Sequence, residues 1–266
     1  MKQIFSTLVL SLRYLWFLLR SHSRFAVHSP FVYDLITNVF KDQTPYPEYK
    51  IAENARRQCL RSRRIIEISN FGASSKKKSF LNPLKQVREI AQSAIGRRSG
   101  RLLHRLVKHF APETILELGT SIGISALYLA SAAPEAKMVT LEGCASTAEL
   151  AADNIRESGL KNVEIHTGEF SIVLPGYLKT CNKIDFAFFD GNHTFKATMA
   201  YFNSCLPYAG ENSVFVFHDI HWSGGMADAW KLICANKGIT VSIDLFDIGL
   251  VFFNKGLSKQ DFVIRF

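Results

Sequence analysis

One stretch of the sequence combines a carboxylate with two glycines: Glu117-Leu-Gly119-Thr-Ser-Ile-Gly123. The apolar run 114–118 has the length and β-branched content of a buried strand, and residues 121–133 predict a helix. A strand that enters a helix through a glycine turn forms a small-ligand site, because glycine allows close approach and the helix amides point toward the ligand. A carboxylate at the strand end suits a cationic or amino-bearing ligand. The spacing differs from the G-x-G-x-x-G pattern that binds a dinucleotide pyrophosphate.

Glu142 ends the next predicted strand, 137–142, and follows Gly123 by 19 residues. In doubly wound nucleotide sites a carboxylate about 20 residues after the glycines accepts hydrogen bonds from ribose hydroxyls. Taken alone, Glu142 would be an ordinary exposed residue at a strand end. Its place after Glu117 and the glycine turn favours the ribose role.

Two later strands end in acidic residues and histidines. Residues 184–190 lead into Asp190-Gly-Asn-His193, and residues 213–219 end at Asp219. Packing does not explain the first cluster, although Asp190 and His193 could also cap the helix that follows. Histidine is a natural general base because its pKa lies near working pH. Two carboxylates at adjacent strand ends could also bind a divalent metal.

These blocks resemble the motifs of the class I S-adenosylmethionine (SAM)-dependent methyltransferases. The E-x-G-x-x-x-G turn resembles motif I, and 189–193 with 216–219 resemble the corresponding blocks of a small-molecule O-methyltransferase branch. The resemblance covers roughly residues 101–266. It implies that the glycine turn holds the amino-acid part of SAM, that Glu142 holds the ribose and that residues 168–170, otherwise an ordinary loop, contact the adenine. The implied cofactor-binding residues are Glu117, Gly119, Thr120, Ser121, Gly123, Glu142, Glu169, Phe170 and Asp190.

The resemblance also implies that His193 and Asp219 act on the methyl acceptor, with His193 as the general base. Metal-dependent relatives bind their ion through two aspartates and an asparagine directly after the second. Here Asp190 and Asp219 match the aspartates, but Ile220 occupies the third position. A neighbouring histidine could substitute, although histidine suits Mg²⁺ poorly. A Mg²⁺ ion at Asp190 and Asp219 therefore stays an open alternative.

Strands and helices alternate from residue 114 onward, which predicts an α/β fold. The expected architecture is a doubly wound, Rossmann-like, mainly parallel sheet with helices on both faces and a ligand crevice at the carboxyl ends of the strands. Two apolar runs in 240–254 predict a closing hairpin joined at Gly249, which would make one edge antiparallel. The resemblance implies seven strands that end in such a pair.

Residues 1–100 predict a helical, basic cap on a catalytic domain formed by residues 101–266. Residues 1–110 contain 21 Lys and Arg but 6 Asp and Glu, a net charge of +15, whereas residues 111–266 have a net charge of −6. A basic front favours an anionic partner, such as an anionic substrate, RNA or a membrane surface, or it is only a solvated face. Arginines within 56–64 and the run Lys76–Lys78 contribute to it. No aromatic residues interleave with them as stacking platforms for RNA.

Residues 1–20 predict an amphipathic helix, because Arg13 interrupts the apolar run 4–19 and the run is shorter than the ~20 residues of a spanning helix. Packing on the body is favoured over weak contact with a membrane surface, which Trp16 and Phe17 keep open. The five cysteines are widely spaced and include no C-x-x-C pair, as expected of thiols in a reducing compartment.

The sequence thus predicts a cytoplasmic, SAM-dependent methyltransferase that methylates an oxygen of a small molecule, for which the basic region makes an anionic acceptor reasonable. An RNA methyltransferase, a nicotinamide-dependent dehydrogenase and a non-enzymatic, membrane-peripheral protein on the same fold are the alternatives. A homo-oligomer also stays open.

Overall fold

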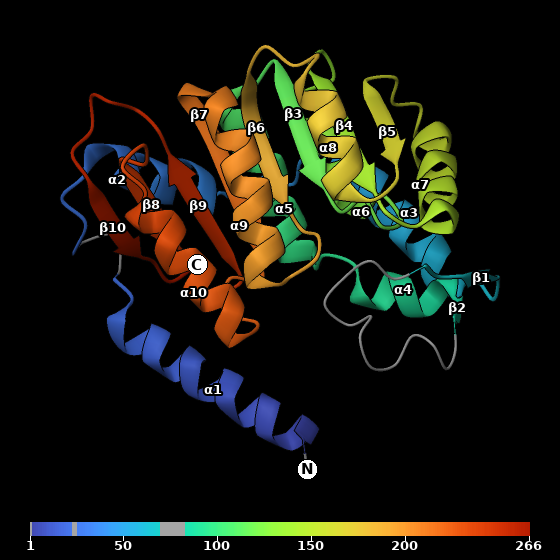
Figure 1. Ribbon diagram of the computed structural model, residues 1–266, viewed down its shortest axis with the longest axis horizontal. Coiled ribbons are helices and arrows are strands. Elements are labelled where there is room, and N and C mark those ends of the chain that lie inside the picture. The colour runs from blue at the N-terminus through green and yellow to red at the C-terminus, as the bar shows by residue number, and fades with distance from the viewer. Residues whose placement is uncertain (1, 23–25, 70–82) are drawn as a thin grey trace.

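A mixed sheet forms the centre of the computed structural model, which describes residues 2–22, 26–69 and 83–266 (Figure 1). Within these residues the sheet has eight strands in the order β10-β8-β9-β7-β6-β3-β4-β5. β9 is antiparallel to both of its neighbours, and the other adjacent pairs are parallel. The strands are β3 (Thr114–Leu118), β4 (Lys137–Glu142), β5 (Val163–Thr167), β6 (Ile184–Phe189), β7 (Ala209–His218), β8 (Val241–Asp244), β9 (Ile248–Phe252) and β10 (Gln260–Val263).

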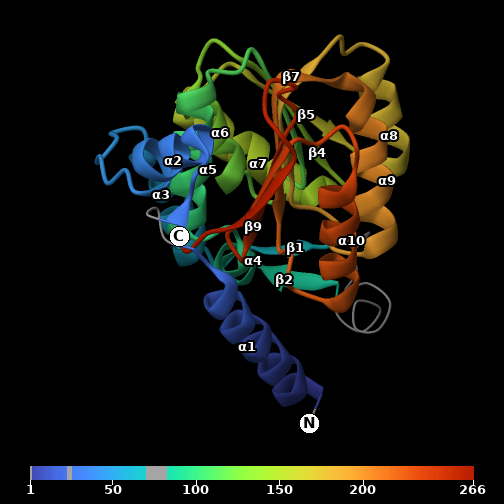
Figure 2. The ribbon, with the colours of Figure 1, turned by 90° about the vertical axis from the view of Figure 1, so that its left-hand side faces the viewer.

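Helices cover both faces of this sheet. Successive residues of a strand point to opposite sides, and the central strands are apolar on both sides, so each face needs a layer of helices to bury it. Ile115 and Phe186 face a core shared with α5 and α6, whereas Leu116 and Ala187 face a second core shared with α8, α9 and α10. Figure 2 shows the two helix layers on opposite sides of the sheet. The helices of the doubly wound part are α5 (Arg97–Phe110), α6 (Ile124–Ala132), α7 (Ala145–Ser158), α8 (Phe170–Leu178), α9 (Phe195–Cys205), the short 3₁₀ helix η4 (Leu206–Tyr208) and α10 (Gly224–Ala235).

The predicted doubly wound, mainly parallel sheet is confirmed, but two details of its closing edge were wrong. β10 adds an eighth strand parallel to β8; it is short and only partly buried, so it left no apolar run in the sequence. The turn between β8 and β9 lies at residues 245–247, and Gly249 is inside β9. A Cβ atom on Gly249 would lie 2.6 Å from the ring of Trp230, so this glycine allows close packing of α10 and does not make the turn.

Two segments outside the central strands also differ from the prediction. Phe170–Leu178 is the helix α8, which was not among the predicted elements, and it contains Pro175. Residues 1–100 were predicted to be helical, but they also contain the strand β2 (Leu84–Gln86), which pairs antiparallel with β1 (Ile65–Glu67). The helix α4 (Val87–Ser93) begins directly after β2.

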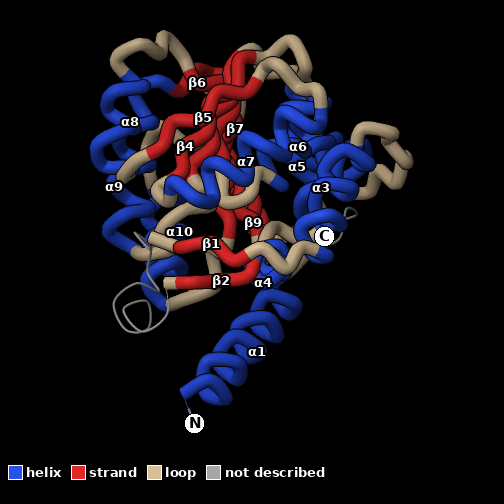
Figure 3. Tube along the Cα trace, turned by 90° about the vertical axis from the view of Figure 1, so that its right-hand side faces the viewer, coloured by secondary structure: helices blue, strands red, loops and turns tan. Residues whose placement is uncertain are grey.

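The rest of the N-terminal region is helical. It comprises α1 (Lys2–Arg20), α2 (Pro30–Leu35), the π-helix η2 (Ile36–Phe40) and α3 (Tyr49–Arg61). α2, η2 and α3 contribute to the same hydrophobic core as α5 and α6. α1 extends away from the body and contacts it near its C-terminal half (Figure 3), where Phe17 is buried against Phe246. Lys76–Lys78 lie outside the described residues.

None of the helices in the described part of the chain is both long enough and apolar enough to cross a membrane.

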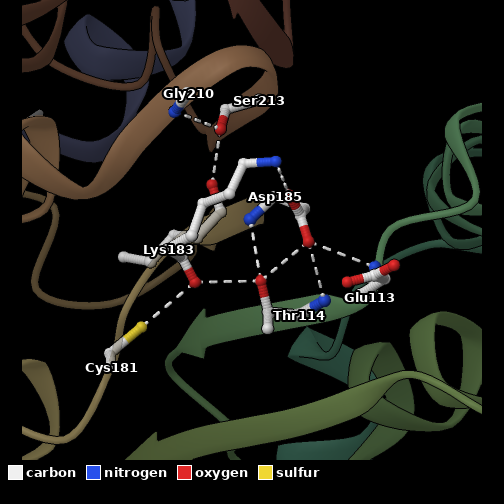
Figure 4. Close-up of polar contacts among 8 residues, drawn as sticks. Glu113, Thr114, Cys181, Lys183, Asp185, Gly210 and Ser213 are labelled. Atoms are coloured by element: carbon white, nitrogen blue, oxygen red, sulfur yellow. Dashed lines mark hydrogen bonds and ion pairs between the residues drawn. The ribbon is translucent and has the colours of Figure 1, made fainter.

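The amino ends of the central strands are joined by a polar network (Figure 4). Asp185 at the start of β6 accepts hydrogen bonds from the backbone N–H and the hydroxyl of Thr114 on β3, at 3.1 and 3.0 Å. Its other oxygen lies 2.6 Å from Nζ of Lys183. Ser213 on β7 donates to the carbonyl of Ile184 at 2.6 Å. These contacts fix the relative positions of β3, β6 and β7, whose opposite ends carry the predicted site.

Candidate active site

The turn between β3 and α6 needs its glycines for conformation and for space. Gly119 has φ of 108°, and a Cβ atom there would lie 2.6 Å from the carbonyl oxygen of Asp190. Gly123, the residue before α6, has φ of 84° and lies close to Ala151 on α7. Ser121 between them also has positive φ, at 50°. The turn is thus pressed against the end of β6, which brings the motif and Asp190 together at one edge of the sheet.

Glu117 lies below this turn and is fully buried. Thr140 donates a hydrogen bond to its Oε2 at 2.6 Å, and Oε1 has no partner among the described residues. Burial raises the pKa of Glu117 to about 8, so the fold favours the protonated carboxyl at neutral pH. Glu117 does not line the cavity described below. The structure therefore places it as a support beneath the site.

Glu142 closes the other side of the turn at the end of β4. Its carboxylate accepts hydrogen bonds from the backbone N–H of Ser121 at 2.6 Å and of Cys144 at 2.9 Å. Burial raises the pKa of Glu142 in spite of these two bonds. Glu142 lines the cavity described below, where carboxylate oxygens can accept hydrogen bonds from the hydroxyl groups of a ligand.

A cavity of about 420 Å³ opens at these strand ends and has a volume typical of small-molecule sites. Most of the predicted site residues line it: Gly119, Thr120, Ser121, Glu142, Glu169, Phe170, Asp190, His193 and Asp219. The structure thus brings these residues together and leaves Glu117 and Gly123 outside the lining. The fold also contributes residues that the sequence analysis did not assign, among them Ser125, Cys144, Asn192, Tyr201 and His218.

An aromatic wall lies beside Glu169. Phe170 begins α8 and packs edge-on against Tyr201 of α9, with ring centroids 5.6 Å apart. A Cβ atom on Gly191 would lie 2.4 Å from the Phe170 ring, so the glycine after Asp190 makes room for it. Glu169 accepts a hydrogen bond from the Ser171 hydroxyl at 2.7 Å. A flat ring with an exocyclic amine fits between such a wall and such an acceptor.

Four polar side chains meet where β6 and β7 end. Nδ1 of His218 lies 2.7 Å from Oδ1 of Asp190. Nε2 of His193 lies 3.6 Å from the same Asp190 oxygen and 3.8 Å from Oδ2 of Asp219. Asp219 adopts a left-handed backbone conformation, with φ of 57°, and its N–H donates to the carbonyl of Asp247 at 2.7 Å. The two carboxylates therefore flank His193.

The charges in this cluster depend on one another. Burial by itself would lower the pKa of His218, but Asp190 and the further carboxylates Asp219 and Asp247 raise it to about 9. Burial raises the pKa of Asp219, and the two neighbouring histidines oppose that shift. His218 is thus a cation at neutral pH that is paired with Asp190.

With this geometry defined, the chain can be compared with known proteins. Residues 116–220 match a family model described as a methyltransferase domain. A curated transmembrane O-methyltransferase homolog from Rattus norvegicus is 38% identical over 86 residues, which are 31% of this chain and 33% of that protein. The catechol O-methyltransferase of Mycobacterium tuberculosis is 28% identical over 140 residues, which are 52% of this chain and 62% of that protein. Residues 116–220 therefore form a methyltransferase domain, and this part of the chain is similar to O-methyltransferases.

Solved methyltransferase structures share the fold. The O-methyltransferase from Bacillus cereus, in complex with S-adenosylhomocysteine (SAH), has a TM-score of 0.54 at 22% identity, covering 68% of this chain and 98% of that one. The O-methyltransferase TomG from Streptomyces achromogenes, in complex with SAM, has a TM-score of 0.56 at 22% identity, covering 84% and 94%. The first curated relatives are matched over only about a third of their length, so the comparison concerns the domain and not the whole of those proteins.

The methyltransferase cavity suits SAM on its own geometry. Backbone residues of the glycine turn and the carboxylate residue Glu142 line the cavity together, and the aromatic wall lies next to Glu169.

A metal ion fits the same methyltransferase site less well. Asp190 and Asp219 are the two carboxylates expected to bind Mg²⁺, but Oδ1 of Asp190 is hydrogen-bonded to His218. Ile220, at the position of the expected third ligand, is buried and has no donor atom. Within residues 2–22, 26–69 and 83–266 there is no cluster of three or more metal-ligating side chains suitably placed. The donor set does not support a Mg²⁺ site.

The N-terminal region also contributes to the methyltransferase cavity, which sequence reasoning did not foresee at the level of residues. Lys85 of β2, Glu89 of α4 and Ile95 lie in its lining. The sequence indicated their position only through the prediction that residues 1–100 form a cap on the catalytic domain. Trp222, three residues after Asp219, is 64% exposed and does not line the cavity.

Proposed function

We propose that this protein transfers the methyl group of SAM to a hydroxyl oxygen of a small molecule. The observation that carries the proposal is the position of His193, whose Nε2 lies within 3.8 Å of carboxylate oxygens of both Asp190 and Asp219 at the edge of the glycine-turn cavity. The named O-methyltransferase relatives support this function over methylation of RNA or a non-enzymatic role.

SAM, when bound, supplies an electrophilic methyl group on a sulfonium. The glycine turn with Thr120 and Ser121 would face its amino-acid part, Glu142 its ribose, and Glu169 with Phe170 its adenine. Glu117 would act from below by holding Thr140 and the turn in place. Because methyl transfer is an in-line displacement, the main task of these residues is to position the two reactants.

The chemical step that we assign to side chains of this protein is the transfer of the acceptor's hydroxyl proton. His193 accepts the hydroxyl proton of the acceptor at Nε2 while the oxygen–methyl bond forms and the sulfur–methyl bond breaks. Asp190 and Asp219 stabilise the imidazolium that results, since opposite charges at this distance in a partly buried site attract strongly. The products are the methyl ether and SAH, and His193 then returns its proton to solvent.

The test is a transfer assay with methyl-labelled SAM and a panel of hydroxyl acceptors, starting with catechols because a relative bears that name. His193→Ala should lower kcat on the order of 100-fold or more, the usual contribution of a general base, with SAH affinity unchanged. His109→Ala is the matched control, because His109 lies on α5 and pairs with Asp34 at 3.4 Å. Transfer that His193→Ala leaves intact, or no transfer to any hydroxyl acceptor, would contradict the proposal.

We also propose that α1 contacts an anionic membrane surface. Tyr14 and Phe17 pack on Phe246, and Arg13 donates to the His221 carbonyl at 2.9 Å. This packing leaves one apolar face in solvent, formed by Leu12, Leu15, Trp16 and Leu19. α1 contains no acidic residue, and Arg13 and Arg20 carry positive charge. Exposed apolar residues together with cations are typical of helices that lie in a membrane interface.

Sedimentation with phosphatidylcholine vesicles, with and without phosphatidylglycerol, tests this contact. Trp16→Ser should reduce binding to the anionic vesicles severalfold, because Trp16 is 61% exposed. Leu60→Ser, a change of an exposed apolar residue on α3, should leave binding unchanged. Equal binding by all three proteins would exclude α1 as the contact. A cytoplasmic location remains part of the proposal.

A further inference from the structure

A second cavity, separate from the methyltransferase site, lies between α5, η2 and the residues after β10. Its volume is about 840 Å³. Six of the residues that line it are cations: Lys41, Arg97, Arg98, Arg101, Arg105 and Arg265. Arg97, Arg101 and Arg105 follow one another at intervals of four residues, so they form a single stripe along α5.

The described carboxylates leave most of this charge uncompensated. Glu53 pairs with Arg101, at 2.9 Å from Nε to Oε1, and more distantly with Arg97, at 3.9 Å. No other carboxylate in the described ranges forms an ion pair with the six cations. Asp42 is in the neighbouring connector, but its oxygens accept hydrogen bonds from Thr44 and Tyr46.

Arg105 is the most informative of the six because it is buried, with 8% of its surface exposed. Its Nε donates to the carbonyl of Val39 at 2.6 Å, and its Nη1 lies 3.5 Å from the hydroxyl of Tyr49. Both partners are neutral. Asp42 attracts Arg105 from a distance, as the contribution of Arg105 to lowering the Asp42 pKa against the effect of burial shows, but forms no direct ion pair with it. A buried guanidinium without a direct ionic partner is unfavourable, and an anion in the adjoining cavity would relieve that cost.

The cavity also has features that suit a phosphoryl group in particular. Guanidinium groups bind phosphate through paired N–H donors. α5 begins here with no acidic residue in its first turn and no side-chain cap, so the free amides of that turn and the helix dipole favour an anion. Ile36, Phe40 and Phe266 supply an apolar part of the lining, which suits a phosphate ester more than free inorganic phosphate.

We propose that this cavity is a binding site for the phosphoryl groups of an anionic ligand. The ligand could be a soluble phosphorylated compound or the head group of a phospholipid. A lipid source is compatible with the location, because Arg265 of the cavity approaches the end of α1 and lies 3.3 Å from the carbonyl of Leu18. The site does not depend on the proposed methyl transfer.

The experiment compares the full-length protein with the variant Lys41→Gln/Arg98→Gln. Both side chains are exposed, and neither has an ion-pair partner among the described residues, so the change should preserve the fold. Calorimetric titration with inorganic pyrophosphate should show binding to the wild type that is roughly tenfold or more weaker in the variant. The matched control Arg156→Gln/Lys255→Gln removes two exposed cations elsewhere and should bind pyrophosphate within about twofold of wild type.

A second arm distinguishes the two sources. Sedimentation with vesicles that contain phosphatidylinositol 4-phosphate, compared with phosphatidylcholine alone, should show binding that pyrophosphate competes away if the ligand is a lipid head group. Pyrophosphate binding without such vesicle binding would assign the site to a soluble phosphorylated compound. The inference is overturned if neither probe binds the wild type, or if the cavity variant and the control variant bind them equally.

Discussion

β6 carries a carboxylate at each end, and the two ends differ in how the protein treats the charge. At the amino end, Asp185 is surrounded by donors from Thr114, Glu113 and Lys183. Although burial opposes it, these donors lower the pKa of Asp185 below its usual value. At the carboxyl end, Asp190 faces the histidine cluster, and burial raises the pKa of neighbouring Asp219 and Glu142. At the amino end, hydrogen bonds and an ion pair favour the charged carboxylate. At the carboxyl end, burial disfavours the charged form of the carboxyl groups.

This difference in pKa indicates that Asp185 stabilises the fold, whereas the carboxyl groups at the opposite edge belong to a ligand-binding site. The network in Figure 4 joins three strands, and Asp185 does not line the methyltransferase cavity. The opposite edge combines positive-φ residues, incompletely satisfied carboxylates and a cavity, and such features collect at functional sites. A variant of Asp190 should therefore affect activity most, and a variant of Asp185 should affect stability alone.

The largest effect is expected for Asp190→Asn. The substitution removes the charge that pairs with His218 and flanks His193, so the histidines lose their electrostatic support. Methyl transfer should fall on the order of 100-fold, and the melting temperature should also fall because the buried cation of His218 loses its partner. Initial rates with labelled SAM together with thermal unfolding measure both quantities. A fully active variant would contradict a role of Asp190 in methyl transfer.

A smaller effect, on stability alone, is expected for Asp185→Asn. The variant loses its ion pair with Lys183 and weakens three hydrogen bonds, which should lower the free energy of unfolding by about 2 kcal/mol. Because the lowered pKa stabilises the folded state above the unfolded value, the wild-type advantage should disappear as the pH falls through the pKa of folded Asp185. Urea unfolding at several pH values tests this. Loss of SAH affinity in this variant would contradict the separation of roles.

The third prediction concerns only the pH dependence of stability, through Glu117, a buried carboxyl group beneath the site that the fold holds protonated. Because its pKa is raised to about 8, the folded state binds more protons than the unfolded state between the ordinary value of 4.5 and that pKa. Glu117 should therefore reduce stability as the pH rises through this window, by up to about 1.4 kcal/mol per pH unit. Glu117→Gln keeps the shape and should flatten the dependence. An unchanged slope in urea unfolding from pH 5 to 8 would show that Glu117 is ionised.

The sequence sufficed for features that depend on local chemistry. The strand–glycine–helix unit and the ends of β4, β6 and β7 follow from residue type and spacing, so the cavity could be located from Gly119, Glu142, Asp190 and Asp219. The sequence likewise predicted the helices α1 and α6 within a few positions of their observed bounds.

The features that the sequence did not predict depend on tertiary packing. Glu117 lies next to the glycine turn in sequence, yet it is buried because β3 is central and the turn closes over it. Gly249 resembled a turn residue, but its role is to admit the ring of Trp230. His218 was only a neighbour of Asp219 in the sequence, and its bond to Asp190 exists because β6 and β7 pair in register. A contact between residues that are far apart in the chain leaves no pattern in the sequence around either residue.

Calorimetric titration of SAH into the wild type and Glu142→Ala tests the central claim most directly. Glu142 anchors Ser121 and Cys144 and lines the cavity. Glu164→Ala is the matched control, because Glu164 ends in solvent on β5. We expect micromolar binding to the wild type and the control, and a loss of about 100-fold in Glu142→Ala, as two charged hydrogen bonds would give. No binding of SAH to the wild type, or equal binding by all three proteins, would contradict a SAM site at this edge of the sheet.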